Sequence, residues 1–477
     1  MYIRPGCFLG VCLALLAWAT SLPAEDAVGW RTDGQGGYPS ASLPDLSDAN
    51  AVTWKTKLPD WSNATPCVVK TPAGQTRVFV MTEPNSLICI DGGGKILWQR
   101  ATTFLDTASD PAGRKKLEKD AIAYRRLEKK LAPIKKELDR LGKEIRKARK
   151  DPELKKDANA MHRVVHTLEN KRLPLWKKAR PIEMERKKLT VFQKPRTHGG
   201  TGYTSPTPLS DGQRVWVLLG TGIAACYDMQ GKLQWARLVE IPKRGWGHSA
   251  SPVLADGKLI CHVRDLWGLD PSSGKVLWRG EARNAFGTPA VLTVGERTLV
   301  VSCGGWAVDA SDGTEVAGKL PKLSYNSPVV DGQTVYFVQN GGKAIRFSVD
   351  DGGAVQHTEL WRTTPKRDRY YASPVLHEGL LYAVTQKGVL SAIDAADGKV
   401  VYEQQLDLGR GKVYPSVTLV GGKLLILSEG GGYVVARPGR TFSKLTSGRL
   451  SPGRSTPVTG PSGAMYRRGK EYLYCIQ

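Results

Sequence analysis

Short apolar runs alternate with turn residues along most of this 477-residue chain. Residues 252–279 show the pattern well: β-branched and aromatic side chains gather in brief runs, and Asp256-Gly257 separates the first two. Such runs, bounded by Gly, Asp and Pro, are typical of antiparallel strands joined by tight turns. The segment therefore predicts four strands, at residues 252–254, 258–263, 266–270 and 275–279.

This four-strand unit returns at a nearly constant interval. A small residue and a proline open each copy, and successive prolines lie 37 to 46 residues apart after a first gap of 140 residues. Four strands per unit of about 40 residues is the blade of a β-propeller, and the regular period argues against a β-sandwich. The starts predict an all-β, eight-bladed β-propeller, or a seven-bladed one if the weak start is not a true blade. They are Thr65-Pro66, Ser205-Pro206, Ser251-Pro252, Thr288-Pro289, Ser327-Pro328, Ser373-Pro374, Thr456-Pro457 and, weakly, Tyr414-Pro415.

A second repeated pattern marks the turn before the fourth strand. An Asp opens the turn, a Gly-Lys pair ends it, and an aromatic residue follows, as in Asp270 to Trp278 and, with Tyr, in Asp394 to Tyr402. Asp caps such a turn, Gly adopts the positive φ, and Trp provides a large apolar face between neighbouring blades. We therefore interpret a set of tryptophans as structural: Trp54, Trp98, Trp235, Trp278 and Trp361.

This Asp-x-x-x-Gly-Lys-x-x-Trp pattern resembles the tryptophan-docking repeat of pyrroloquinoline-quinone (PQQ)-type propellers. The resemblance implies either a quinoprotein alcohol dehydrogenase or a non-catalytic member, such as the propeller lipoprotein of outer-membrane assembly. The dehydrogenases hold PQQ and calcium with a Glu, Asn and Asp set that this sequence does not reveal, and their vicinal Cys-Cys is absent here. We expect the non-catalytic branch with no cofactor, and a PQQ-dependent dehydrogenase with calcium is the alternative.

Residues 107–196 interrupt the repeat. Between Pro111 and Arg196 there are 29 Lys and Arg against 12 Asp and Glu, a net charge of +17 out of +24 for the whole chain. Asp151-Pro152 divides two helical patterns, and the second runs to about Leu189. The segment predicts an inserted antiparallel α-helical coiled-coil hairpin that bends at Pro133 and Pro174. The seam of the first helix is Tyr124, Leu127, Leu131, Ile134, Leu138, Leu141, Ile145 and Ala148.

Topology predicts where this arm emerges. It connects a fourth strand to the next first strand, so it rises from the face on which the first strands begin. The loops there should form an aromatic and basic mouth of the central channel, suited to an anionic or planar ligand. The ligand-binding candidates are Asn63, Tyr203, His248, Phe286, Asn326, Tyr371, Tyr414 and Arg454, with Lys366, Arg367, Arg369, Arg410 and Lys412 in the same loops.

The ends of the chain predict export and closure. An apolar stretch at 7–19 precedes a possible cleavage site before Glu25, which indicates a signal peptide at 1–24 and a periplasmic or extracellular protein. Residues 51–58 resemble a fourth strand and should pair with 472–476. We predict a closing strand and first blade at 25–106, the basic hairpin at 107–196 and blades two to eight at 197–477.

Catalytic signatures are scarce. HExxH, Gly-x-Ser-x-Gly, P-loop and Rossmann motifs are absent from the sequence, and His162 and His166 lack an acidic third ligand for a metal. Six cysteines outside the leader are expected to be buried and free. The sequence thus favours an exported scaffold that binds a protein or an anionic envelope component, not nucleic acid, with no transmembrane segment in the mature chain. The arm residues expected to bind are Lys135, Lys136, Arg146, Lys147 and Arg149.

Overall fold

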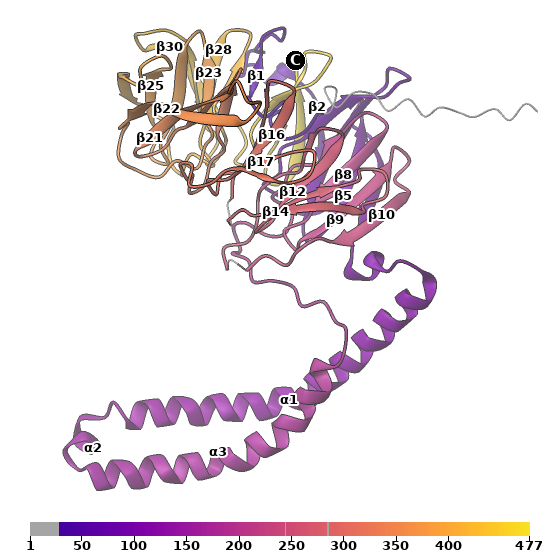
Figure 1. Ribbon diagram of the computed structural model, residues 1–477, viewed down its shortest axis with the longest axis vertical. Helices are drawn as coiled ribbons and strands as arrows, with labels where there is room; N and C mark the ends of the chain where they lie inside the picture. Colours follow the sequence, from indigo (N-terminus) through magenta and orange to yellow (C-terminus); the bar gives the residue numbers. More distant parts are fainter. Residues whose placement is uncertain (1–27, 244, 284–285) are drawn as a thin grey trace, which may run out of the picture.

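The computed structural model describes residues 28–243, 245–283 and 286–477, so the predicted signal peptide lies outside the described residues. The described strands form eight sheets, and a helical hairpin projects from them (Figure 1). This is the architecture of four-stranded β-propeller sheets with a helical insertion. In most sheets the hydrogen-bonded order of the strands is their order along the chain.

The first four sheets after the N-terminal segment consist of consecutive strands. They are β3 (Cys67–Lys70), β4 (Thr76–Thr82), β5 (Ser86–Asp91) and β6 (Ile96–Ala101); β7 (Leu209–Ser210), β8 (Arg214–Leu218), β9 (Ile223–Asp228) and β10 (Leu233–Leu238); β11 (Val253–Ala255), β12 (Lys258–His262), β13 (Leu266–Leu269) and β14 (Val276–Gly280); β15 (Ala290–Val294), β16 (Arg297–Val301), β17 (Ala307–Asp309) and β18 (Glu315–Ala317). Strands β11 to β14 confirm the four strands predicted for residues 252–279.

Of the remaining four sheets, two again consist of consecutive strands and two include a strand from the N-terminal part of the chain. They are β19 (Val329–Asp331), β20 (Thr334–Phe337), β21 (Gly342–Val349) and β22 (Val355–Thr363); β23 (Val375–His377), β24 (Leu380–Val384), β25 (Val389–Asp394) and β26 (Val400–Gln405); β27 (Thr418–Val420), β28 (Lys423–Leu427), β29 (Gly432–Arg437) and β30 (Ser443–Arg449), joined by β1 (Gly37–Tyr38); β31 (Val458–Thr459), β32 (Met465–Arg468) and β33 (Tyr472–Ile476), joined by β2 (Val52–Lys57).

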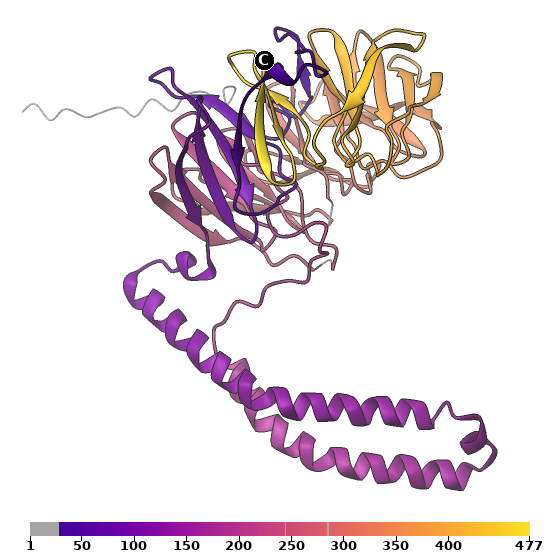
Figure 2. The same ribbon diagram turned by 180° about the vertical axis from the view of Figure 1, so that it is seen from behind.

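The predicted pairing of the two ends of the chain is confirmed. Strand β2 runs antiparallel to β33, with Lys55 opposite Tyr474 and Trp54 opposite Cys475. Figure 2 shows the indigo β2 beside the yellow C-terminal strands. The N-terminal strand thus completes a sheet whose other three strands come from the end of the chain.

Apolar cores lie between neighbouring sheets. One core joins the sheet of β3 to that of β7, and each later sheet shares a core with the next. A further core packs Val68 and Val78 of the β3 sheet against Val458 and Leu473 of the last sheet. The series of sheets therefore closes on itself, and interfaces between sheets bury most of the apolar surface.

A chain of hydroxyl hydrogen bonds links the starts of the first strands. The backbone N–H of Ser251 donates to Oγ1 of Thr288 at 3.1 Å, and the N–H of Thr288 donates to Oγ of Ser327 at 2.9 Å. The same contact repeats from sheet to sheet, so a Ser or Thr next to a proline supplies an acceptor to the neighbouring sheet. The linked residues are Thr65, Thr207, Ser251, Thr288, Ser327, Ser373, Ser416 and Thr456.

This series of hydrogen bonds corrects the predicted start at Ser205-Pro206. In that sheet the linking hydroxyl belongs to Thr207, which precedes Pro208, because the N–H of Thr65 donates to Oγ1 of Thr207. In the weak repeat, Ser416 supplies the hydroxyl although it follows Pro415. Both alternatives are Ser or Thr next to proline, so only the neighbouring sheet decides which one is used.

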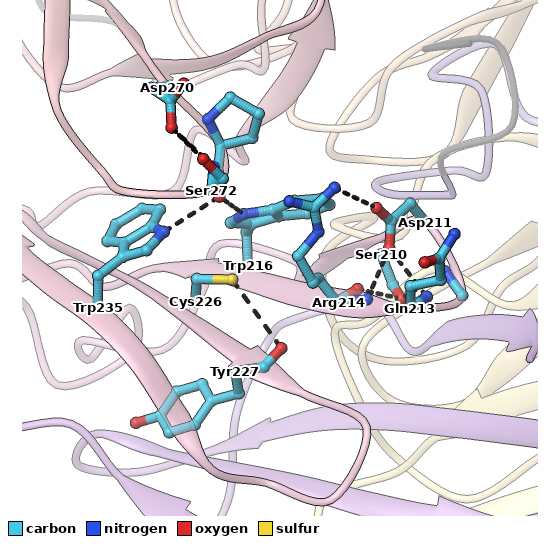
Figure 3. Close-up of polar contacts among 12 residues, drawn as sticks. Ser210, Asp211, Gln213, Arg214, Trp216, Cys226, Tyr227, Trp235, Asp270 and Ser272 are labelled. Carbon is cyan, nitrogen blue, oxygen red and sulfur yellow. Dashed lines mark hydrogen bonds and ion pairs between the residues drawn. The ribbon is translucent and has the colours of Figure 1, made fainter. Parts of the chain in front are cut away.

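The tryptophans dock on the turn of the following sheet. The indole N–H of Trp235 donates to the carbonyl oxygen of Pro271 at 3.0 Å, next to Asp270, and Trp216 donates to the same oxygen (Figure 3). The turn glycine, Gly274, has a φ of 67°, and a Cβ on it would lie 2.5 Å from the indole of Trp235. Trp54, Trp98, Trp278 and Trp361 make the equivalent contact to Gly92, Met229, Ala310 and Ala395.

The N-terminal segment, residues 28–42, crosses between sheets that are far apart in the chain. Val28 pairs through its backbone with Ser210 at the end of β7, and β1 lies parallel to β27. Arg31 is fully buried and donates to the carbonyl oxygens of Pro374 at 2.9 Å and Val417 at 2.8 Å. We call this segment the strap, because it ties the sheets of β7, β23 and β27 together.

The helical arm lies between β6, a fourth strand, and β7, a first strand, as predicted. After the 3-10 turn η3 (Phe104–Thr107) it consists of α1 (Pro111–Ala148), α2 (Pro152–Lys156) and α3 (Ala158–Lys187). The predicted single second helix is wrong, because Asp157 caps a new helix after α2. Both long helices bend midway (Figure 1), and they contain Pro133, Pro174 and Pro181.

Most of the predicted seam of α1 is buried, and Leu131, Ile134 and Leu138 pack with Ala179 of α3. No helix in the described ranges is long and apolar enough to cross a membrane. The six cysteines of the described chain are free and buried. Burial raises the pKa of the Cys261 thiol to about 12, so it is neutral at physiological pH.

Candidate functional site

The loops that precede the first strands converge with the base of the arm. The chain returns from the arm through residues 194–203, and the carbonyl oxygen of Gly200 in this loop accepts from Asn63 and from Arg454, both at 2.7 Å. Asn63 precedes β3 and Arg454 precedes β31. The first and last sheets therefore meet the base of the arm at Gly200. We call the surface formed by the loops that precede the first strands the mouth.

Aromatic rings continue from this point along the mouth. Tyr371 stacks on Tyr414 with 4.8 Å between ring centroids, and Tyr325 meets Tyr371 edge-on at 4.8 Å. Phe286 extends the row, 6.1 Å from Tyr325. These four rings, from four consecutive sheets, form an aromatic arc. The sequence identified three of its members, whereas Tyr325 was missed although it also precedes a repeat proline.

Cations cover the end of the arc. The guanidinium of Arg454 lies 4.6 Å from the ring centroid of Tyr414, and the ammonium of Lys412 lies 6.0 Å from that of Tyr371. Arg454 also pairs with Glu429 at 2.7 Å, and Arg369 donates to the hydroxyl of Tyr371 at 3.3 Å. Such cation–π contacts orient the side chains and leave the mouth basic.

Tyr203 lies in the return loop of the arm, apart from the arc. Its hydroxyl donates to the carbonyl oxygen of Pro195 at 2.8 Å, and the ammonium of Lys194 lies 5.6 Å from its ring centroid. Its backbone N–H donates to Glu83 at 2.8 Å. These contacts anchor the base of the arm to the sheet of β3, so Tyr203 positions this loop.

The structure corrects two of the predicted mouth residues. His248 and Asn326 are each 2% exposed, so neither lines the surface of the mouth. The amide of Asn326 donates to the carbonyl oxygen of Val338 at 2.8 Å, which makes it a loop-bracing residue. Tyr371 and Tyr414, at comparable places in their repeats, are half-buried, and residue type alone does not distinguish these cases.

His248 lies near a second buried histidine, His262. Burial, and then the charge of His262, lowers the pKa of His248 to about 3. Burial also lowers the pKa of His262 to about 4, and this ring is 3.1 Å from the carbonyl oxygen of Arg283. Both imidazoles are therefore neutral at pH 7.

The mouth residues do not fit a quinone with calcium. Tyr371 stacks on Tyr414 and Tyr325 packs edge-on against Tyr371, so these rings contact one another and leave no slot for a planar ligand between them. The nearby carboxylates are engaged: Glu83 accepts from Tyr203 and Thr204, and Glu429 pairs with Arg454. Nowhere in the described part of the chain do three or more His, Cys, Asp or Glu form a metal-binding group.

The predicted binding residues of the arm lie far from the mouth along α1. Lys136, Arg146, Lys147 and Arg149 are exposed, and Lys135 is half-buried. Arg149 pairs with Glu169 of α3 at 3.0 Å, which links the two helices near their turn. The arm and the mouth are thus two separate basic surfaces.

Arg31 of the strap was not identified from the sequence as a functional or structural residue. This arginine carries no periodic signal, because its role depends on carbonyl oxygens that lie more than 340 residues away. Burial lowers the pKa of Arg31 to about 10, so it remains charged at pH 7.

Comparison with known proteins identifies the repeat. The family model for the outer membrane protein assembly factor BamB matches residues 220–370 and 353–456. The BamB of Salmonella typhimurium is 27% identical over 177 residues, 34% of this chain and 43% of the relative. That of Escherichia coli is 26% identical over 170 residues, 33% of this chain and 41% of the relative. The chain thus spans less than half the length of these relatives.

Two solved structures share the fold. A europium-containing methanol dehydrogenase superposes with a TM-score of 0.53 at 10% identity, covering 92% of this chain and 88% of the other. A quinohemoprotein alcohol dehydrogenase from Comamonas testosteroni gives a TM-score of 0.50 at 12% identity, covering 94% and 80%. At such identities the likeness establishes the propeller-type fold alone.

Proposed function

We propose that this chain, a PQQ-like repeat propeller resembling the outer membrane protein assembly factor BamB, is an exported scaffold without catalytic activity or cofactor. In this proposal the eight described sheets are the blades of one propeller, and the arm is a basic antiparallel coiled coil. Its partner is a protein or another anionic component of the cell envelope.

The charge of the arm carries this proposal. The net charge of +17 is that of residues 111–196, whose helices project away from the sheets (Figure 2). Lys136, Arg146 and Lys147 are exposed and form no ion pair within the described residues. Cations without partners on a projecting element attract anionic surfaces and add little to the stability of the fold.

Cross-linking in intact cells tests the proposal. The wild-type protein should cross-link from the arm to a reproducible partner in the envelope fraction. Reversal of the five arm cations Lys135, Lys136, Arg146, Lys147 and Arg149 to Glu should abolish the cross-link. The matched control reverses five exposed lysines of the sheets, Lys95, Lys232, Lys275, Lys423 and Lys444, with the same change in net charge.

The control variant should retain the cross-link, and raised salt should weaken the interaction of the purified wild-type protein, because exposed charges are screened. If both sets of reversals weaken the cross-link equally, net charge alone governs the interaction and the arm is not the binding element. If neither set of reversals weakens the cross-link, the arm is a spacer.

A further inference from the structure

Three apolar side chains stand exposed on one flank of α3. Leu173, Trp176 and Met184 are 54%, 50% and 53% exposed. Together with Arg180 and Lys187 they follow steps of three and four residues, which places them on one side of the helix. The flank therefore carries apolar and cationic side chains on the same side of the helix.

This flank is not used in the packing of the arm. The contact between the two long helices involves Leu175, Ala179 and Ile182 of α3, which pack against residues of α1 such as Leu131. Leu173, Trp176 and Met184 lie outside this contact. Figure 1 shows the arm extending away from the sheets, so no strand covers the flank.

The same half of α3 is strongly basic. Residues 171–188 contain eight Lys and Arg, and their two acidic residues are Glu183 and Glu185. Arg186 pairs with Glu128 of α1. In the described structure the other seven basic residues have no ion-pair partner, so their charge is available to an external anion.

We propose that this flank of α3, defined by Leu173, Trp176, Arg180, Met184 and Lys187, docks on an anionic lipid surface. The inference rests on the proposed function, since it names the class of anionic envelope component that the arm contacts. Single apolar side chains between cations can enter the interface of a bilayer, with cations at the headgroups and an indole at the boundary. An acidic protein helix would instead need a continuous apolar groove, which these separated side chains do not form.

Sedimentation with vesicles tests the proposal on the purified full chain. The protein should bind vesicles of phosphatidylcholine containing phosphatidylglycerol, bind vesicles of phosphatidylcholine alone at least tenfold more weakly, and be released by salt. A triple variant, Leu173→Ser, Trp176→Ser and Met184→Ser, should bind the anionic vesicles at least tenfold more weakly than the wild type. Its helical circular dichroism should be unchanged, because these side chains lie outside the packed contact.

The matched control removes three exposed apolar residues from the sheets, Leu277→Ser, Leu360→Ser and Leu445→Ser, which are 46%, 42% and 41% exposed. This variant should bind like the wild type. Equal binding by the α3 triple variant, or no binding of the wild type to anionic vesicles, overturns the lipid proposal. In either case a cross-link from the arm to an envelope protein would leave the proposed scaffold function intact.

Discussion

In five sheets, one glycine in the turn before the fourth strand meets two requirements at once. Gly274 adopts a left-handed backbone conformation, and its missing Cβ makes room for the indole of Trp235 from the preceding sheet. Where the preceding sheet has Ala317 in place of Trp, a Cβ on the equivalent Gly353 would meet no atom within 4 Å, although its φ is still 81°. The docking requirement therefore depends on the neighbour, whereas the conformational requirement is local.

The two requirements can be separated by substitution. Gly257 and Gly274 both have a φ of 67°, but a Cβ on Gly257 meets nothing within 4 Å. Gly257→Ala should lower the free energy of unfolding by about 1–2 kcal/mol, the cost of a left-handed L-residue. Gly274→Ala should cost about 1–3 kcal/mol more, because the indole must move. Urea denaturation of both variants measures the difference, and equal losses would show that docking is not tight.

The buried histidines predict a pH dependence. In the folded state the pKa of His248 is about 3 and that of His262 about 4, both below the unfolded value of about 6.5. Between these pKa values the unfolded chain binds more protons than the folded chain. The free energy of unfolding therefore decreases as pH falls from about 6.5 toward 4.

We expect the His248→Gln variant to lose less stability than the wild type between pH 7.5 and pH 5, as measured by urea denaturation at each pH. His357→Gln provides the control, because this histidine is exposed. If the free energy of unfolding of the His248→Gln variant fell with pH as steeply as that of the wild type, His248 would become protonated without cost in the folded state.

At the scale of elements, the first strands are joined by side chains as well as by packing. Seven sheets offer a hydroxyl to the backbone of a neighbouring sheet, and the strap bridges sheets that are far apart through Arg31. In the arm, α1 and α3 pack through apolar residues, and the ion pairs of Arg149 with Glu169 and of Arg186 with Glu128 link the two sides of the hairpin.

The hydroxyl link can be tested at Thr288. Thr288→Val preserves the shape of the side chain but leaves the buried N–H of Ser251 without its acceptor, so we expect a loss of about 1–3 kcal/mol in the free energy of unfolding. Thr288→Ser keeps the hydroxyl and should retain most of this stability. Urea denaturation distinguishes the two variants, and a loss in Thr288→Ser as large as that in Thr288→Val would contradict a stabilising role specific to the hydroxyl.

For the whole molecule, the arm and the sheets are held together at a narrow base. Phe104 of η3 stacks on Phe192 with 5.4 Å between ring centroids, and the carbonyl oxygen of Pro195 accepts from the hydroxyl of Tyr203. The long helices pack mainly on each other. We therefore expect the sheets to fold without the arm, provided that its base is kept.

Two deletions test this expectation. Removal of residues 110–191, with a short Gly-Ser linker, should reduce the helical circular dichroism and leave a cooperative melt near the wild-type temperature. Removal of residues 110–195 also deletes Phe192 and the acceptor of Tyr203, so this variant should melt at a lower temperature. Loss of the cooperative melt in the shorter deletion would mean that the arm stabilises the sheets directly.

The sequence by itself determined the repeated four-strand unit, the helical insertion and the pairing of β2 with β33. These features follow from the periods of two and of three to four residues, and from turn residues whose preferences are local. The aromatic arc was also partly predicted, through Phe286, Tyr371 and Tyr414, because its members occupy the same place in consecutive repeats.

Only the tertiary structure decided which of two equivalent side chains is used. Thr207 rather than Ser205 links its sheet, His248 and Asn326 turn inward while Tyr371 remains at the mouth, and Arg31 reaches carbonyl oxygens of distant strands. Asp157 divides the second helix of the arm by capping α3. The physical reason is common to the first three: a hydrogen bond or a buried position depends on where a partner from another part of the chain lies in space, and residue type and spacing do not contain that distance.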